Sequence, residues 1–131
     1  GIMRADDAEQ AIEHGVDGIV VSNHGGRNMD SAPAPIQVLP EIVKAVDGRM
    51  TVIVDSGVRR GSDIVKCMAL GADAVLAGRA TLYGTAAGGE AGATKAIDIL
   101  KDEMKRTMAY IGKQRVADIS LDDIWQGSLP H

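Results

Sequence analysis

The side chains best suited to chemistry fall in three short segments that contain glycine. The first segment, SNHGGR, carries Ser22, His24 and Arg27. An imidazole with a pKa near ~6.5 can accept a proton at neutral pH, and a guanidinium can hold a carboxylate through two parallel hydrogen bonds. The pair suits a small carboxylic acid, with Arg27 binding the carboxylate while His24 removes a proton from the hydroxyl-bearing carbon or from the hydroxyl.

The other two segments suit a phosphate group. DSGVRRG begins at Asp55, and a Gly-Arg pair stands at 78–79. Glycines at 57 and 78 let backbone N–H groups approach an anion, and the N-termini of the helices that follow favour negative charge. Arg59 and Arg79 can add charge-assisted hydrogen bonds. Asp55 fits two roles, an acceptor for a sugar-like hydroxyl or a cap of the following turn.

Each segment follows an apolar run of strand length and precedes a helix. The runs show no polar alternation, which is typical of strands buried on both faces of a parallel sheet. Repetition of GVDGIV as GADAVL supports repeating strand–helix units, and working residues of such folds lie at the carboxyl ends of the strands. The predicted strands are 17–23, 50–56 and 72–78, and the predicted helices are 5–14, 36–46 and 62–70, followed by one long helix.

Several finer expectations concern the helices. Pro40 is tolerated only near a first turn, so the second helix is predicted to begin after Ile36. Cys67 is predicted to lie in a helix core, and Arg60 to be a solvated charge. Residues 113–131 are interpreted as a terminal tail with a short helix over 120–125. The long helix is predicted to bury a stripe made of Ile97, Leu100, Met104, Met108 and Ile111.

Three parallel strands leave two open edges, whereas a closed (β/α)8 barrel needs eight strands and about 250 residues. Barrel phosphate sites often use the loops after strands 7 and 8, so the three predicted strands correspond to strands 6 to 8. The fold class is therefore α/β, the C-terminal half of a (β/α)8 TIM barrel. Because the chain starts at Gly1 and leads directly into a helical pattern, we expect it to be a piece of a longer protein.

Composition argues against several other functions. Eighteen acidic and fourteen basic residues give a net charge of -4, and aromatic residues make up 2% of the chain, so nucleic acid is not an expected partner. A single cysteine excludes an internal disulfide, and we expect no metal site. The apolar runs are far shorter than the roughly 20 residues of a membrane span.

The motifs SNHGGR, DSGVRRGSD, ALGAD and GR resemble the FMN-dependent 2-hydroxy-acid dehydrogenases and oxidases, which include glycolate oxidase, lactate dehydrogenases, flavocytochrome b2 and mandelate dehydrogenase. The resemblance covers nearly the whole chain, in the order of the family's carboxyl-terminal half. It implies that 1–131 is part of one FMN-binding domain of an enzyme that oxidises an L-2-hydroxy acid to a 2-oxo acid. It also implies a cytoplasmic homo-oligomer, peripheral to the inner membrane in some parents.

The resemblance assigns roles to individual residues. His24 corresponds to the catalytic base and Arg27 to the arginine that binds the substrate carboxylate. Asp55 corresponds to the acceptor for ribityl hydroxyls, and Ser22 to a residue near the isoalloxazine edge. The complete set expected to bind FMN is Ser22, Asp55, Ser56, Gly57, Arg59, Gly78 and Arg79. The DSG triplet, where glycolate oxidases usually have DGG, is closer to the bacterial dehydrogenases.

Other family features do not occur in this sequence. These are a lysine near flavin N1, tyrosines that contact the substrate, and the aspartate that orients the base histidine. We therefore expect the missing amino-terminal half of the barrel to be a partner, and the chain alone to have little or no turnover. Two alternatives stay open: a non-catalytic half-barrel that binds phosphate or FMN and self-associates, and another phosphate-binding barrel enzyme, which would not require NHGGR.

Overall fold

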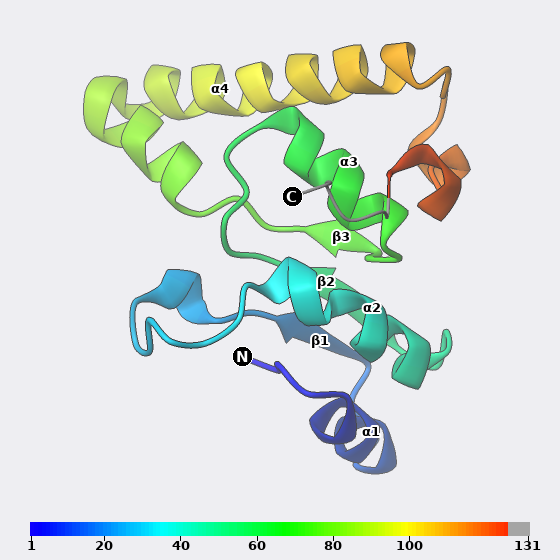
Figure 1. Ribbon diagram of the computed structural model, residues 1–131. Coiled ribbons are helices and arrows are strands. Elements are labelled where there is room, and N and C mark those ends of the chain that lie inside the picture. Colours follow the sequence, from blue (N-terminus) through cyan, green and yellow to red (C-terminus); the bar gives the residue numbers. More distant parts are fainter. Residues whose placement is uncertain (126–131) are drawn as a thin grey trace, which may run out of the picture.

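A computed structural model describes residues 1–125 and shows strands alternating with helices (Figure 1). The three strands, β1 (Gly18–Val21), β2 (Thr51–Val54) and β3 (Ala74–Val75), form one parallel sheet in that order. In its register Val20 pairs with Ile53, and Ile53 pairs with Ala74. The α/β class and the consecutive strand–helix units are confirmed, whereas the assignment to barrel strands 6 to 8 stays a prediction. In chain order the elements are α1 (Ala5–Glu13), β1 (Gly18–Val21), the 3-10 turn η1 (His24–Gly26), α2 (Pro35–Val46), β2 (Thr51–Val54), α3 (Gly61–Ala69), β3 (Ala74–Val75), α4 (Arg79–Tyr110), η2 (Val116–Asp118) and η3 (Leu121–Asp123).

The sheet is covered on one face. Alternate strand residues Ile19, Val21, Val52 and Val54 are buried in a core that α1 and α2 complete with Ala8, Leu39, Ile42 and Val46. On the opposite face Val20 and Ile53 are only partly buried, and Ala74 is exposed. The expectation of strands buried on both faces is therefore wrong within the described residues. Strand–helix–strand crossovers are right-handed, so the helices that connect successive neighbouring strands lie on the same side of the sheet. The three strands of this chain therefore leave the other side open.

The start of α2 also differs from expectation. The helix begins at Pro35, because the Gln37 side chain accepts a hydrogen bond of 2.9 Å from the Ala34 N–H, and proline is well suited to the first helical position. Pro40 consequently lies beyond the first turn. It is exposed, so its ring faces solvent while the helix loses one backbone hydrogen bond.

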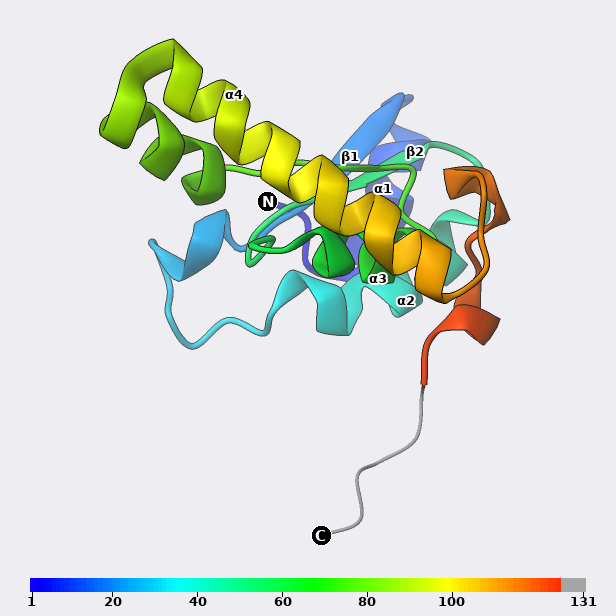
Figure 2. The same ribbon diagram turned by 90° about the horizontal axis from the view of Figure 1, so that it is seen from above.

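Helix α4 doubles back on itself at Gly88 and Gly89, where the backbone leaves the helical region (Figures 1 and 2). Residues 79–87 and 90–110 form two helical arms, which touch where Gly84 meets Gly92. At either glycine, a Cβ atom would collide with the backbone carbonyl of the other. The two glycines therefore let the arms pack at backbone contact distance.

The apolar stripe of α4 is confirmed in part. Leu100 and Met108 are buried, and Met104 and Ile111 pack against the cluster formed with α3. Ile97 is 47% exposed, so its predicted burial is wrong. The start of α3 lies against Met104, and Ile97 lies nearly two turns before Met104 in α4, beyond the start of α3.

The described part of the tail packs onto the same cluster. Ile119 is buried and Ile124 partly buried beside Val65 and Ala69 of α3, and Lys113 pairs with Asp123 at 3.2 Å. The predicted short helix over 120–125 is a 3-10 turn, η3, in which the Ser120 N–H donates to the Asp123 carboxylate at 2.8 Å. Residues 126–131 of the predicted tail lie outside the described residues. Cys67 is buried in the core, as predicted.

Candidate active site

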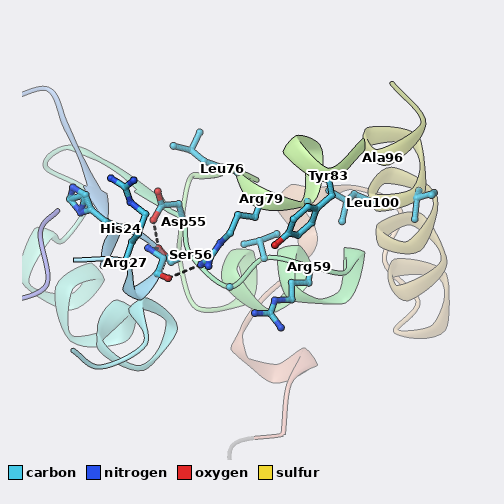
Figure 3. Close-up of a pocket in the computed structure, with 16 residues that line it drawn as sticks. His24, Arg27, Asp55, Ser56, Arg59, Leu76, Arg79, Tyr83, Ala96 and Leu100 are labelled. Atoms are coloured by element: carbon cyan, nitrogen blue, oxygen red, sulfur yellow. Dashed lines mark hydrogen bonds between the residues drawn. The ribbon is translucent and has the colours of Figure 1, made fainter. Parts of the chain in front are cut away.

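The three glycine-containing segments meet at the carboxyl edge of the sheet in one cleft of about 830 Å³. Figure 3 shows His24 and Arg27 at one end, Asp55 and Ser56 in the middle, and Arg59, Arg79 and Tyr83 toward the other end. Ser22 is buried and lies outside the lining. The candidate residues that line the cleft are His24, Arg27, Asp55, Ser56, Gly57, Arg59, Gly78 and Arg79.

His24 stands in a tight turn directly after β1. The buried Ser22 hydroxyl accepts a hydrogen bond of 3.1 Å from the His24 N–H, and the Asn23 side chain accepts one of 3.1 Å from the Gly26 N–H. The backbone of His24 is left-handed, with φ of 57°, a conformation that needs support from its surroundings. The imidazole lies close to Gly1, and no residue of 1–125 hydrogen-bonds it. Ser22 thus shapes the turn that presents an exposed imidazole.

The segment after β2 is held by two carboxylates. Asp63 accepts hydrogen bonds from the N–H groups of Arg59 and Arg60, both at 3.0 Å, and Glu103 of α4 accepts one from the Gly61 N–H at 2.8 Å. The first N–H groups around the start of α3 are therefore already bonded. The expectation that this helix N-terminus faces an anion is wrong, because these two side chains cap it.

The two arginines of this segment point to different partners. Arg60 pairs with Glu103 at 2.9 Å, and its side chain is 70% exposed. The expectation of a solvated charge is therefore confirmed, and the ion pair with Glu103 adds to it. Arg59 lines the cleft, and its guanidinium forms no ion pair with another described side chain. The same loop thus holds one arginine against α4 and leaves its neighbour available to an anion.

The start of α4 differs from the start of α3. Gly78 precedes the helix, and no side chain within the described range caps its first turn, so the helix dipole and the leading N–H groups stay open to a ligand. The Arg79 guanidinium donates a hydrogen bond of 2.7 Å to the carbonyl of Gly25. Arg79 therefore joins the anion end of the cleft to the turn that carries His24.

Asp55 and Ser56 occupy the middle of the cleft. Asp55 is partly buried and accepts a hydrogen bond of 2.8 Å from the Ser56 hydroxyl through Oδ1. The other oxygen, Oδ2, accepts no hydrogen bond from a residue of 1–125, and no backbone N–H of that range donates to the carboxylate. The capping role is therefore not seen among the described residues, and the role as acceptor for a ligand hydroxyl stays a prediction.

Sequence reasoning missed two residues that build this site. Asp63 stands at the third position of α3, where an acidic side chain is a usual sign of a helix start, so its role was detectable. Glu103 comes 42 residues after Gly61 and carries no local signal. The role of Glu103 in the site depends on the packing of α4 against α3.

Among residues 1–125, no group of three or more His, Cys, Asp or Glu side chains is placed to hold a metal ion. No helix in that same range has the length and apolar character that crossing a membrane requires.

Comparisons with known proteins identify the family. The model of the FMN-dependent dehydrogenase family matches residues 1–126. A peroxisomal (S)-2-hydroxyacid oxidase of Arabidopsis thaliana is 53% identical over 95% of this chain and 34% of its own length, and an L-lactate oxidase of a Nostoc species is 52% identical over 91% and 33%. The crystal structure of the monotopic membrane protein (S)-mandelate dehydrogenase superposes with a TM-score of 0.93 at 47% identity, over 97% of this chain and 34% of that one.

The chain therefore belongs to the FMN-dependent dehydrogenase family, and the resemblance of its motifs is confirmed. The related proteins are oxidases and dehydrogenases of 2-hydroxy acids, and FMN is the cofactor of the family. The chain spans about a third of the length of the relatives it matches.

Proposed function

We propose that this chain supplies the base, the substrate arginine and part of the flavin site of an enzyme that oxidises an L-2-hydroxy acid to a 2-oxo acid. One observation carries the proposal: His24 and Arg27 line the same cleft as Arg59 and Arg79. The hydrogen bond of 2.7 Å from Arg79 to the Gly25 carbonyl connects the two ends of this cleft. A carboxylic acid and a phosphorylated cofactor can therefore bind side by side.

The donor groups of the cleft fit FMN. Arg59 and Arg79 supply two cations, and the uncapped start of α4 supplies backbone N–H groups, which together suit a phosphate. The second carboxylate oxygen of Asp55 can accept a ribityl hydroxyl. Gly57 and Gly78 line the cleft without side chains that would block these groups.

The chemistry divides between the two ends of the cleft. Arg27 would bind and orient the substrate carboxylate, and its planar guanidinium restricts the rotation of the acid. His24 would take a proton from the substrate at one imidazole nitrogen. Bound FMN supplies the acceptor for the two electrons that leave the substrate. In this proposal Ser22 keeps the His24 turn in place by accepting a hydrogen bond from the His24 N–H.

A second part of the proposal concerns the rest of the barrel. Val20 and Ile53 lie on the uncovered face of the sheet, and Leu76 and Tyr83 are 48% and 68% exposed at the cleft. Relatives have about three times the matched length, so further barrel strands would cover this face and shield the cleft from water. We infer that the isolated chain has little or no turnover.

The first test is a titration of the purified chain with FMN, followed by flavin fluorescence, with inorganic phosphate as competitor and R79A as control. Saturable binding that phosphate competes away and that R79A weakens supports the phosphate site. Binding that is insensitive to both would show that flavin is held elsewhere.

A chimera tests the catalytic roles. In it, this chain replaces the matching third of (S)-mandelate dehydrogenase, and the oxidation of 2-hydroxy acids is measured. We expect turnover that falls by about 10²–10⁴-fold in H24Q, because general base catalysis contributes that much. Flavin content is measured in both proteins. An H24Q chimera that holds flavin and retains full turnover would remove His24 from the base role.

A further inference from the structure

Ser56 has a backbone conformation that serine rarely adopts. Its φ is 68°, in the left-handed region, which is sterically unfavourable for a residue with a Cβ atom and readily adopted by glycine. A non-glycine residue kept in this conformation needs support from the surrounding structure.

The contacts of the Ser56 hydroxyl join two loops. The hydroxyl donates to Asp55 Oδ1 at 2.8 Å, next to it in sequence. It accepts a hydrogen bond of 2.9 Å from the N–H of Gly25, which lies 31 residues away in the turn that carries His24. The strained serine therefore fastens the end of β2 to the end of β1.

Gly25 is held from its other side as well. Its carbonyl accepts the hydrogen bond from Arg79, and a Cβ atom at Gly25 would collide with that guanidinium. A single residue next to His24, Gly25, thus lies between Ser56 and Arg79. Movement of Gly25 would move His24, because the two residues are adjacent in one tight turn.

We propose that Ser56 is a positioning residue, whose hydroxyl fixes the His24 turn against Asp55 and Arg79 and so sets the place of the imidazole in the cleft. The effect of Ser56 on catalysis rests on the proposed role of His24 as base. The hydrogen bonds of Ser56 to Gly25 and Asp55 do not depend on that role. Because the hydroxyl hydrogen is donated to Asp55, Ser56 acts through Gly25 and Asp55, and not as a donor to a ligand.

The test compares S56A and S56G in the full chain by NMR, with S62A as control, since the Ser62 hydroxyl makes no hydrogen bond with the residues of 1–125. Hydrogen exchange of the Gly25 amide and the ring resonances of His24 are measured. S56A removes the hydroxyl and keeps the backbone strain, whereas S56G removes both. We expect about 10-fold faster exchange at Gly25 and shifted His24 resonances in both variants, unchanged exchange at Val54, and no effect of S62A.

Other results would overturn the proposal. Unchanged Gly25 exchange in S56A would show that the hydroxyl does not hold the turn. Equal acceleration at Gly25 and Val54 would show a general loss of stability in place of positioning. An effect of S56A that S56G reverses would assign the change to backbone strain.

The chimera gives a functional readout. We expect S56G to lower kcat several-fold with little change in KM or in flavin content, because the base moves while Arg27 and the anion end stay in place. An unchanged kcat would refute positioning for catalysis. If the unmutated chimera does not turn over, the proposed function fails, and the Gly25 exchange still establishes or refutes the link.

Discussion

At the scale of single residues, two adjacent arginines with the same chemistry have different partners. Arg60 pairs with Glu103 and contributes to the contact between α3 and α4, whereas Arg59 lines the cleft without an ion pair among the described side chains. Asp63 holds the backbone N–H groups of both residues alike, so the two arginines differ only in the partners of their side chains. Residue type alone therefore does not define the anion site.

This pair provides a matched comparison. R59A should weaken FMN binding by about 10–100-fold, because a hydrogen bond to a charged group contributes about 1.5–3 kcal/mol. R60A should change binding less than about two-fold and lower the free energy of unfolding by at most about 1 kcal/mol, as for an exposed ion pair. Flavin fluorescence and urea denaturation measure the two effects. Equal losses of binding in both variants would contradict the assignment.

Cys67 predicts a pH dependence of stability. Burial, with a smaller contribution from Asp63, raises the pKa of the Cys67 thiol from 9.0 to about 11. The folded state favours the protonated thiol, so this stabilisation is complete below pH 9 and is lost between pH 9 and about 11. A shift of this size corresponds to about 2–3 kcal/mol. The free energies of unfolding of the wild type and C67A, measured from pH 8 to 11, should converge by that amount; parallel curves would exclude the effect.

At the scale of elements, α4 connects the cleft to the apolar cluster that it forms with α3. Its first turn carries Arg79, its return arm carries Glu103, and the two arms are joined by the bend at Gly88 and Gly89. The site therefore depends on the hairpin shape of α4, because that shape brings Glu103 to the turn before α3.

Substitution at the contact of the two arms tests this dependence. G84A should lower the free energy of unfolding by about 1–3 kcal/mol, since a methyl group at Gly84 collides with the Gly92 carbonyl and overpacking has this cost. G88A is the control, because nothing lies within 4 Å of a Cβ atom there. Urea denaturation followed by circular dichroism measures both. A G84A protein as stable as G88A would show that the arms do not pack closely.

Glu103 provides a second test at this scale. E103A should destabilise the chain by about 1–3 kcal/mol, because the Gly61 N–H, on a buried residue, loses its acceptor. E90A, an exposed position on the same helix, should have almost no effect. The midpoint of urea unfolding distinguishes the two, and comparable midpoints for E103A and wild type would argue against the anchor.

At the scale of the whole molecule, one face of the sheet is open. Isolated apolar sheet surface promotes association, so the mean sedimentation coefficient of the chain should rise with concentration. I53K, on the uncovered face, should reduce this association, and V16K, at an exposed position away from that face, should not. Association that is unaffected by I53K would place the contact elsewhere.

The sequence by itself determined the alternation of strands and helices, the three glycine-containing loops at the strand ends, and the family. These depend on local periodicity and on short motifs. It also identified eight residues that line the cleft, since strand ends in such folds lie at one edge, whereas the predicted Ser22 lies outside the lining. Tertiary structure alone decided that Glu103 helps to close the start of α3 while the start of α4 stays open, and that Ile97 is exposed. It likewise decided that Ser56 and Arg79 hold Gly25 from two sides. The contacts of Glu103, Ser56 and Arg79 join residues 31 to 54 positions apart, and such contacts exist only when the helices and strands pack together.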